Sequence, residues 1–234
     1  MPYYLSFHQE IINFVKSLSS SPKVWMDTGC GTGSLVSKAI AEFPDTKFLL
    51  IDPSEGMLDQ ARKKMFSYPT GRLEFLKASP TQEFSQNLKE NPDIITAIQC
   101  HHYLSRESRA KATRVCYDLL KEGGIYIIFE NIRPLKEDGI GIGKQYWENF
   151  QLSHGRNENE IQKHLERFDT EYFPITIEAV SYTHLDVYKR QDIEIKIVYL
   201  VKGHVTHAQL QYDGAWGKGL SVAKVNYYGN QSGL

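Results

Sequence analysis

The sequence has few cysteines, no long hydrophobic run and almost no net charge. Its three cysteines, Cys30, Cys100 and Cys116, show no C-x-x-C spacing, which excludes a disulfide framework and a cysteine metal site and suits unpaired thiols in a reducing compartment. No apolar run approaches the ~20 residues that a membrane-spanning helix needs, and the first ten residues lack the basic and apolar stretches of a secretory leader. We therefore expect a cytoplasmic protein with no metal site and no membrane segment.

Charge is balanced, with 27 basic against 28 acidic side chains and a formal net charge of -1. No strong field would draw the whole molecule to nucleic acid or anionic lipid, so a dedicated polyanion binder is not expected. The 234 residues allow one full domain at roughly 100 to 200 residues per domain. The sequence is silent on the oligomeric state.

Short apolar runs alternate with longer segments of helical spacing between residues 23 and 131, as in a parallel sheet whose strands are joined by crossover helices. This pattern predicts an α/β fold with a doubly wound, mostly parallel sheet and helices on both faces. The five predicted strands are Val24–Met26, Phe48–Ile51, Leu73–Leu76, Ile94–Ile98 and Ile125–Phe129.

Several helices have recognisable faces and ends. Residues 5–18 are predicted to form a helix that covers either the site or only the sheet. Ser54 and Ser105 are predicted N-caps, and Gly123-Gly124 is expected to stop the helix before the fifth strand. Two more helices are predicted from the apolar stripes Leu35, Val36, Ala39, Ile40, Phe43 and Met57, Leu58, Ala61, Met65. The polar, glycine-rich residues 136–143 precede renewed helical spacing from Tyr146 to Phe168, which we expect over the carboxyl edge of the sheet.

The strongest local signal is the run from Asp27 to Gly33, where the first strand ends and a helix begins. Its three alternate glycines allow a sharp turn and the close approach of a ligand. A dinucleotide fingerprint would need a third glycine at Ser34. Asp27 would also repel a pyrophosphate, whereas it would attract a ligand that carries an amino group and a sulfonium.

A second carboxylate, Asp52, ends the second predicted strand, 19 residues beyond Gly33. In doubly wound folds an acid at this place accepts hydrogen bonds from the ribose hydroxyls of a bound nucleoside. Either feature alone has a structural interpretation, because a lone strand-end aspartate is often only a helix cap. Together, at this spacing, they indicate a nucleoside site.

Here the sequence resembles the class I S-adenosylmethionine-dependent methyltransferases, with their D-x-G-x-G-x-G motif at residues 27–33 and their ribose-binding acid at Asp52. The resemblance continues through residues 93–104 and 119–129 and covers residues 1–179. It implies a Rossmann-like methyltransferase that uses S-adenosyl-L-methionine. The cofactor-binding residues that it implies are Asp27, Gly29, Cys30, Gly31, Gly33, Asp52, Pro53, Ser79 and Gln99.

One departure concerns adenine recognition. After the third strand many members carry an acid that holds the adenine amino group, whereas this chain has Ala78-Ser79-Pro80. Ser79 can accept one hydrogen bond there, more weakly than a carboxylate.

Methyl transfer mainly requires alignment of the partners, and a base only when the acceptor must lose a proton. His101, directly after the fourth strand, is our candidate general base, and the alternative is that His101 and His102 cap the next helix or orient the loop. Glu130 is a second candidate that binds an acceptor amine or hydroxyl together with Asn131, or else pairs with Arg133. Weaker candidates in the predicted cover are Tyr146, Trp147 and His154.

Residues 180–191, VSYTHLDVYKRQ, break the pattern. One permitted set of codons for them is almost its own reverse complement and resembles two transposase sequencing adapters joined head to head. We interpret this segment as an assembly artefact, which makes residues 1–179 a C-terminally truncated methyltransferase domain and residues 192–234 an unrelated, unassigned tail. The C-terminal strands would then be missing or replaced. The alternating pattern of residues 192–199 would let the tail pair with the exposed edge of the fifth strand.

The primary hypothesis is methyl transfer from S-adenosylmethionine to an unidentified small-molecule acceptor. One alternative is a non-catalytic S-adenosylmethionine-binding protein or a truncated, inactive one. Another is a nicotinamide-dependent oxidoreductase.

Overall fold

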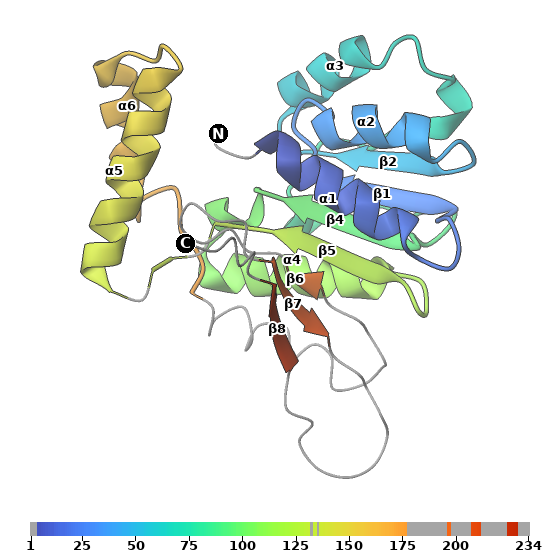
Figure 1. Cartoon of the computed structure of the whole chain (residues 1–234). Coiled ribbons are helices and arrows are strands. Elements are labelled where there is room, and N and C mark those ends of the chain that lie inside the picture. The colour runs from blue at the N-terminus through green and yellow to red at the C-terminus, as the bar shows by residue number, and fades with distance from the viewer. Residues whose placement is uncertain are drawn as a thin grey trace.

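The computed structural model describes residues 4–131, 133–134, 136–176, 196–197, 207–211 and 224–228 (Figure 1). The segment that resembles a sequencing adapter, residues 180–191, lies outside these ranges, so its interpretation stays a prediction. In the described ranges, no helix is long and apolar enough to cross a membrane.

A parallel sheet with the strand order β3-β2-β1-β4-β5-β6 forms the centre of the fold. The five strands predicted from the sequence are confirmed. Their observed bounds are β1 Val24–Thr28, β2 Lys47–Ile51, β3 Leu73–Phe75, β4 Ile94–Ile98 and β5 Ile125–Phe129. The edge of β5 pairs with β6, Lys196–Ile197, in agreement with the expectation that the tail would meet this edge. Two further strands, β7 His207–Gln211 and β8 Lys224–Tyr228, form a separate antiparallel pair.

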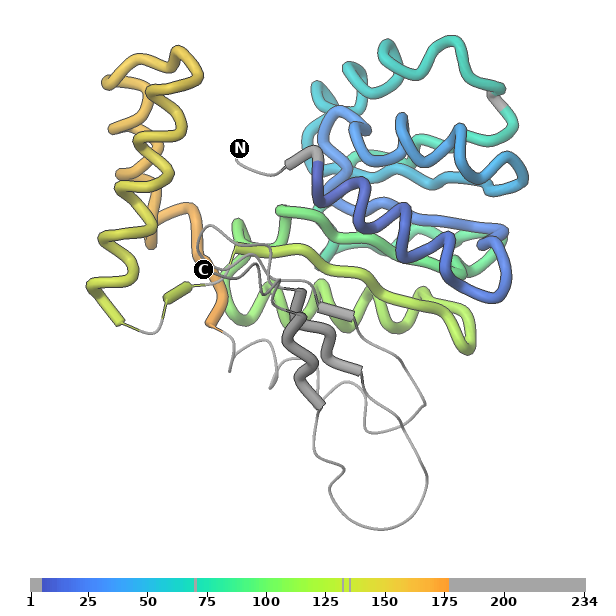
Figure 2. Tube along the Cα trace, in the orientation of Figure 1, coloured from blue at the N-terminus to red at the C-terminus, as the bar shows by residue number. Residues whose placement is uncertain are grey.

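Helices cover both faces of the sheet, as the sequence predicts (Figure 1). Helices α1, α2 and α3 pack on one face, and α4 packs on the other. Two more helices, α5 and α6, stand beyond the carboxyl ends of the strands, as the trace in Figure 2 shows. The helices span α1 Tyr4–Lys16, α2 Ser34–Glu42, α3 Glu55–Lys64, α4 Arg106–Leu119, α5 Glu137–Ser153 and α6 Glu158–Leu165, and short 3-10 turns span η1 Thr70–Arg72, η2 Thr81–Glu83 and η3 His101–Tyr103.

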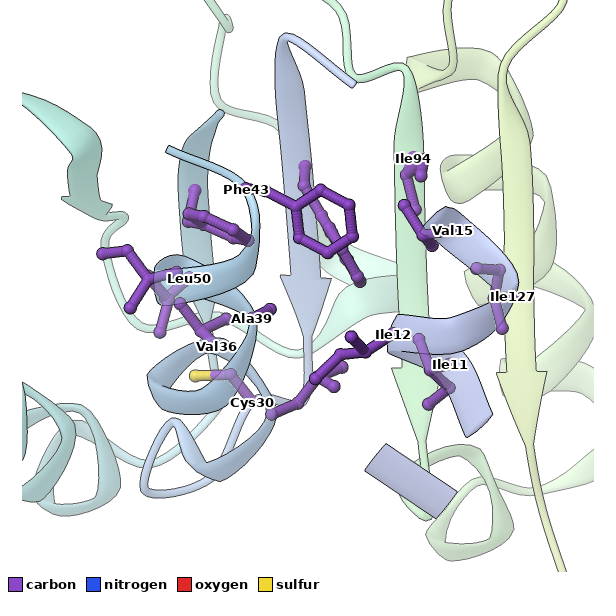
Figure 3. Packing of buried hydrophobic residues seen from close by; sticks show 14 of the residues in the cluster. Ile11, Ile12, Val15, Cys30, Val36, Ala39, Phe43, Leu50, Ile94 and Ile127 are labelled. Carbon is purple, nitrogen blue, oxygen red and sulfur yellow. The ribbon is translucent and has the colours of Figure 1, made fainter. Parts of the chain in front are cut away.

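The larger core lies between the sheet and helices α1 and α2. In Figure 3, Ile11 of α1 lies near Ile127 of β5, and Val36 of α2 lies near Leu50 of β2. Each of these side chains is no more than 2% exposed, so burial of their apolar surface stabilises the fold at roughly 25 cal/mol per Å². Helix α1 therefore covers the sheet, which answers the question that the sequence left open.

The predicted caps are confirmed. The Ser54 hydroxyl accepts a hydrogen bond from the Met57 amide, and the Ser105 hydroxyl accepts one from the Ser108 amide. Helix α4 ends at residue 119, and Gly123, with φ of 72°, belongs to the turn into β5.

Two local predictions are wrong. Met57 is 41% exposed and does not join the buried stripe of α3, which consists of Leu58, Ala61 and Met65. Helix α5 also begins earlier than the renewed helical spacing from Tyr146 predicts, because it starts at Glu137 and includes most of the glycine-rich residues 136–143. Two acids in the first turn of α5 favour its positive end, and this offsets part of the ~1 kcal/mol that each glycine costs in a helix.

Candidate active site

The three alternate glycines form a tight turn between β1 and α2. Gly29, Gly31 and Gly33 have φ angles of 63°, 54° and 69°, which L side chains rarely adopt. A Cβ on Gly29 would lie 2.4 Å from the Cβ of Cys100, whereas a Cβ on Gly31 would meet nothing within 4 Å. The loop is thus packed against the β4 end on one side and open at its centre, as close approach of a ligand requires.

Asp52 ties this loop to the end of β2. Its Oδ2 accepts a hydrogen bond from the Gly31 amide at 2.9 Å, and its Oδ1 accepts one from the Ser54 amide at 2.9 Å. The side chain is largely buried, with 8% exposure. Because Thr28 and Ile51 are register partners at the ends of β1 and β2, Asp52 and Asp27 lie at neighbouring strand tips.

Asp27 is the more deeply buried of the two acids, with 3% exposure. Its Oδ1 accepts a hydrogen bond from the Thr96 hydroxyl at 2.7 Å. Burial raises the pKa of Asp27 to about 7, the Thr96 hydrogen bond opposes that rise, and the negative charge of Asp52 adds to it. When Asp27 is ionised, its attraction for a bound cation would be strong, because little water surrounds the buried carboxylate to screen it.

The other residues that the resemblance implies also lie near this edge. The Cys30 amide donates to the Ile51 carbonyl at 3.0 Å, and burial raises the pKa of the Cys30 thiol far above its usual range. Pro53 is exposed. The Ser79 amide donates to the Asp52 carbonyl at 3.2 Å, while its hydroxyl donates to the Pro80 carbonyl at 3.2 Å, so this hydroxyl is engaged locally.

Gln99, directly after β4, has a left-handed backbone with φ of 55°, which is uncommon for a residue other than glycine. Its amide donates to the Phe129 carbonyl at 2.7 Å, and its Oε1 accepts a hydrogen bond from Asn131 Nδ2 at 2.9 Å. Such strained residues cluster at functional sites, where the surrounding structure holds them.

Glu130 organises the loop that follows β4. Its Oε1 accepts hydrogen bonds from the amides of His101 at 2.7 Å and Cys100 at 3.3 Å, and its Oε2 accepts one from the His102 amide at 3.2 Å. The same Oε2 lies 2.6 Å from His102 Nδ1. Burial alone would raise the pKa of Glu130, but His102 and the hydrogen bonds lower it overall. These contacts engage both oxygens of Glu130, which leaves less room for a direct role toward an acceptor.

The predicted alternative for Glu130, an ion pair with Arg133, is wrong. Arg133 pairs with Asp169 instead, because the Glu130 carboxylate points into the loop of residues 100–102.

His101 is buried with 1% exposure, and its Nδ1 lies 3.1 Å from the Tyr126 hydroxyl. Burial lowers the pKa of His101 to about 4. A ring so weakly basic and so far from solvent is poorly placed to accept a proton from an acceptor. This position favours the alternative for the histidine pair, namely that it orients the loop.

A returning segment, Phe173–Ile175, packs on the same loop. The Phe173 amide donates to the His102 carbonyl at 2.7 Å, and the Ile175 amide donates to the Asn131 carbonyl at 3.1 Å. The buried Arg109 of α4 joins the parts, because it donates to the Phe173 carbonyl at 2.8 Å and to the His101 carbonyl at 3.1 Å. The sequence did not reveal Arg109 as part of the site.

Two of the weaker candidates in the predicted cover, Trp147 and His154, stack on other rings of the α5–α6 region. Trp147 stacks on His164 with ring centroids 4.3 Å apart, and His154 stacks on Phe150 at 4.0 Å. Tyr146 is 49% exposed. Trp147 and His154 therefore support the packing of α5 and α6, and the structure does not bring them to the glycine loop.

Comparisons with known proteins agree with this architecture. Residues 26–126 match the family described as "Methyltransferase domain". The chain is 26% identical over 183 residues to the carboxy-S-adenosyl-L-methionine synthase of Campylobacter lari, which covers 75% of this chain and 73% of that protein. It is 25% identical over 124 residues to the malonyl-acyl-carrier protein O-methyltransferase of Halalkalibacterium halodurans, covering 51% of this chain and 42% of that protein.

Among solved structures, the plantazolicin methyltransferase BamL, in complex with a triazolic desmethylPZN analog and SAH, has the same fold. Its TM-score is 0.59 at 18% identity, and the match covers 80% of this chain and 62% of that chain. The strand order, the glycine turn after β1 and the acid after β2 therefore define a Rossmann-like fold of the methyltransferase type.

The match over residues 26–126, together with this fold, supports an S-adenosylmethionine-dependent methyltransferase that uses S-adenosyl-L-methionine as its cofactor. The chain spans less than two thirds of BamL and of the malonyl-acyl-carrier protein O-methyltransferase.

Proposed function

We propose that this chain binds S-adenosylmethionine at the carboxyl ends of β1, β2 and β4 and directs methyl transfer to a small-molecule acceptor. The observation that carries the proposal is the pair of acids, Asp27 and Asp52, at neighbouring strand tips around a glycine turn whose centre is open at Gly31. S-adenosylmethionine supplies a methyl group that is already activated on a positively charged sulfur.

The residues present fit this cofactor in charge and shape. Asp27 offers a buried negative charge to its ammonium and sulfonium groups, and Asp52 offers acceptors to its ribose hydroxyls. The open space over Gly31 allows the backbone to be approached closely. Ser79 lies next to the end of β3, where the adenine would be held, and Gln99 borders the loop from the β4 side.

The acceptor would lie against the loop of residues 100–103 and the returning segment Phe173–Ile175. Glu130 and Arg109 fix the backbone of this wall through the contacts described above, and this orients an acceptor at little entropic cost during the reaction. Tyr103 is 45% exposed on this wall and offers an apolar ring. We also propose that the protein acts in the cytosol and that its methyl acceptor is a small molecule.

A second candidate is a reaction on S-adenosylmethionine itself. It is favoured by the likeness to a protein whose name is carboxy-S-adenosyl-L-methionine synthase. The same cofactor site would serve both reactions, so the two are separated by their products. Incubation of the chain with S-adenosylmethionine and a metabolite extract, followed by mass spectrometry, shows either S-adenosylhomocysteine with a methylated metabolite or a carboxylated nucleoside.

Calorimetry tests the binding step directly. We expect heat on titration with S-adenosylhomocysteine and none with NAD, and the opposite result would establish the oxidoreductase alternative instead. Binding without any product in the extract would favour the non-catalytic or truncated, inactive protein.

Asp52→Ala tests the ribose assignment. Loss of charged hydrogen bonds of ~1.5 to 3 kcal/mol should weaken S-adenosylhomocysteine binding at least tenfold. Asp118→Ala, on the exposed face of α4, removes a carboxylate with 59% exposure and serves as the matched control that should leave binding unchanged. An affinity within about twofold for Asp52→Ala, in a variant whose circular dichroism is native, would show that the assignment is wrong.

A further inference from the structure

Behind Asp27, a chain of two hydrogen bonds runs into the core. The indole Nε1 of Trp25 donates to the Thr96 hydroxyl at 3.1 Å, and that hydroxyl donates to Asp27 Oδ1 at 2.7 Å. Trp25 and Thr96 are both 0% exposed. We call these three residues the Trp25–Thr96–Asp27 relay.

The relay has a fixed direction. An indole N–H can only donate, so Trp25 occupies a lone pair of the Thr96 oxygen and leaves its single proton to be given elsewhere. That proton has two acceptors within reach, Asp27 Oδ1 at 2.7 Å and the Met26 carbonyl at 3.4 Å. The contact with Asp27 is the shorter one and has a charged acceptor when Asp27 is ionised, so Thr96 then donates to the carboxylate and favours the ionised form.

The sheet and the aromatic core hold the relay in place. Trp25 and Asp27 are two residues apart on β1 and share a face, and Thr96 is the register partner of Asp27 on β4. The Trp25 ring packs against Phe43 and Phe48, with centroids 5.5 and 5.6 Å away.

Packing alone does not explain a hydroxyl at this place. The other residues of β4, Ile94, Ile95, Ala97 and Ile98, are apolar, and valine has nearly the shape of threonine without the cost of burying a polar group. A hydroxyl in the middle of such a strand is explained by its acceptor, Asp27.

Other groups that face Asp27 do not support its charge. Asp52 from the end of β2 repels it, and the thiols of Cys30 and Cys100 are kept uncharged by burial. Thr96 is the group that opposes the effect of burial on this acid. Among the described residues, nothing donates a hydrogen bond to Asp27 Oδ2.

We propose that Thr96 is a positioning residue for cofactor binding, which orients Asp27 and favours its ionised form so that Oδ2 can receive the ammonium group of the ligand. This inference rests on the proposed function and adds a residue to it. Thr96 itself does not contact the cofactor in this proposal, because it acts only through its hydrogen bond to Asp27.

The experiment compares Thr96→Val with the wild type in two measurements. First, ¹³C-carboxyl NMR of the free protein follows the titration of Asp27. Loss of the hydrogen bond should raise its pKa by about one unit in Thr96→Val. Thr96→Ser keeps the hydroxyl and should restore the wild-type titration, and Thr113→Val, which alters a buried threonine of α4, should not change it.

Second, calorimetry from pH 6 to 9 measures the binding of S-adenosylhomocysteine, which carries the ammonium group, and 5'-methylthioadenosine, which lacks it. Since only ionised Asp27 attracts the ammonium, Thr96→Val should weaken the binding of S-adenosylhomocysteine about fivefold at pH 7 and hardly at all at pH 9. The affinity for 5'-methylthioadenosine should stay within about twofold.

Three results would overturn the inference: an unchanged Asp27 titration, an unchanged pH profile of binding, or an equal loss for both nucleosides, which would reveal a purely structural role. If the wild type bound neither nucleoside, the proposed function would fail and the binding role of Thr96 with it. The carboxyl titration would then still decide whether Thr96 holds Asp27 ionised.

Discussion

The burial of Asp27 makes a quantitative prediction about stability. Its pKa rises from 3.8 to about 7 on folding, a difference of about 3 units. At 1.36 kcal/mol per unit this corresponds to about 4 kcal/mol. Between pH 4 and pH 7 the folded state holds a proton here that the unfolded state has released, so this acid lowers the free energy of unfolding as the pH rises.

Asp27→Asn removes this penalty and keeps an acceptor for Thr96. The free energy of unfolding of Asp27→Asn minus that of the wild type should therefore increase by about 4 kcal/mol from pH 4 to pH 8. Urea denaturation followed by circular dichroism at several pH values measures the free energy of unfolding of each protein. The difference is needed because His8 and His101, whose pKa values burial lowers to about 4, act in the opposite direction over the same range and cancel between the two proteins.

A difference that stayed constant over this pH range would refute the reasoning. It would mean that Asp27 titrates as an ordinary surface acid, and that the carboxylate is not enclosed between β1, β4 and the glycine turn.

Three further predictions concern the glycine turn, Glu130 and the adapter-like residues 180–191. Gly29→Ala should cost about 3 kcal/mol of unfolding free energy, from positive φ and a clash, whereas Gly31→Ala, with open space around it, should cost about 1 kcal/mol in the same urea assay. Glu130→Gln should destabilise the protein by about 3 kcal/mol, against no change for the exposed Glu122→Gln, as thermal denaturation will show. Amplification of the source DNA without transposase chemistry should give a reading frame that lacks residues 180–191, and recovery of that codon run intact would contradict the artefact interpretation.

The sheet could be predicted because its signal is local. Each of the five strands is a short apolar run, and β4 and β5 were predicted to the residue because polar or glycine residues bound them on both sides. The acids Asp27 and Asp52 were predicted together because parallel strands end at one edge of the sheet, which is a consequence of topology.

The arrangement around Glu130 could not be predicted in this way. Its partners at residues 100–102 are about thirty positions earlier in the chain, and only the parallel register of β4 and β5 brings them together. The role of Thr96 could not be predicted either, because it depends on the register that places Thr96 on β4 opposite Asp27 on β1. The first turns of α5, before Tyr146, were missed because their glycines argue against a helix, whereas the acids of the first turn favour one.

The left-handed backbone of Gln99 links the stability of the fold to the cofactor contact that the family resemblance predicts for this residue. A glycine at this position would relieve backbone strain of order 1 kcal/mol or more, and it would give up the side-chain amide that Asn131 holds. Selection for thermal robustness alone would thus be expected to replace Gln99. Gln99→Gly should therefore make the scaffold more stable, and its affinity for S-adenosylhomocysteine would test whether the Gln99 side chain contacts the nucleoside.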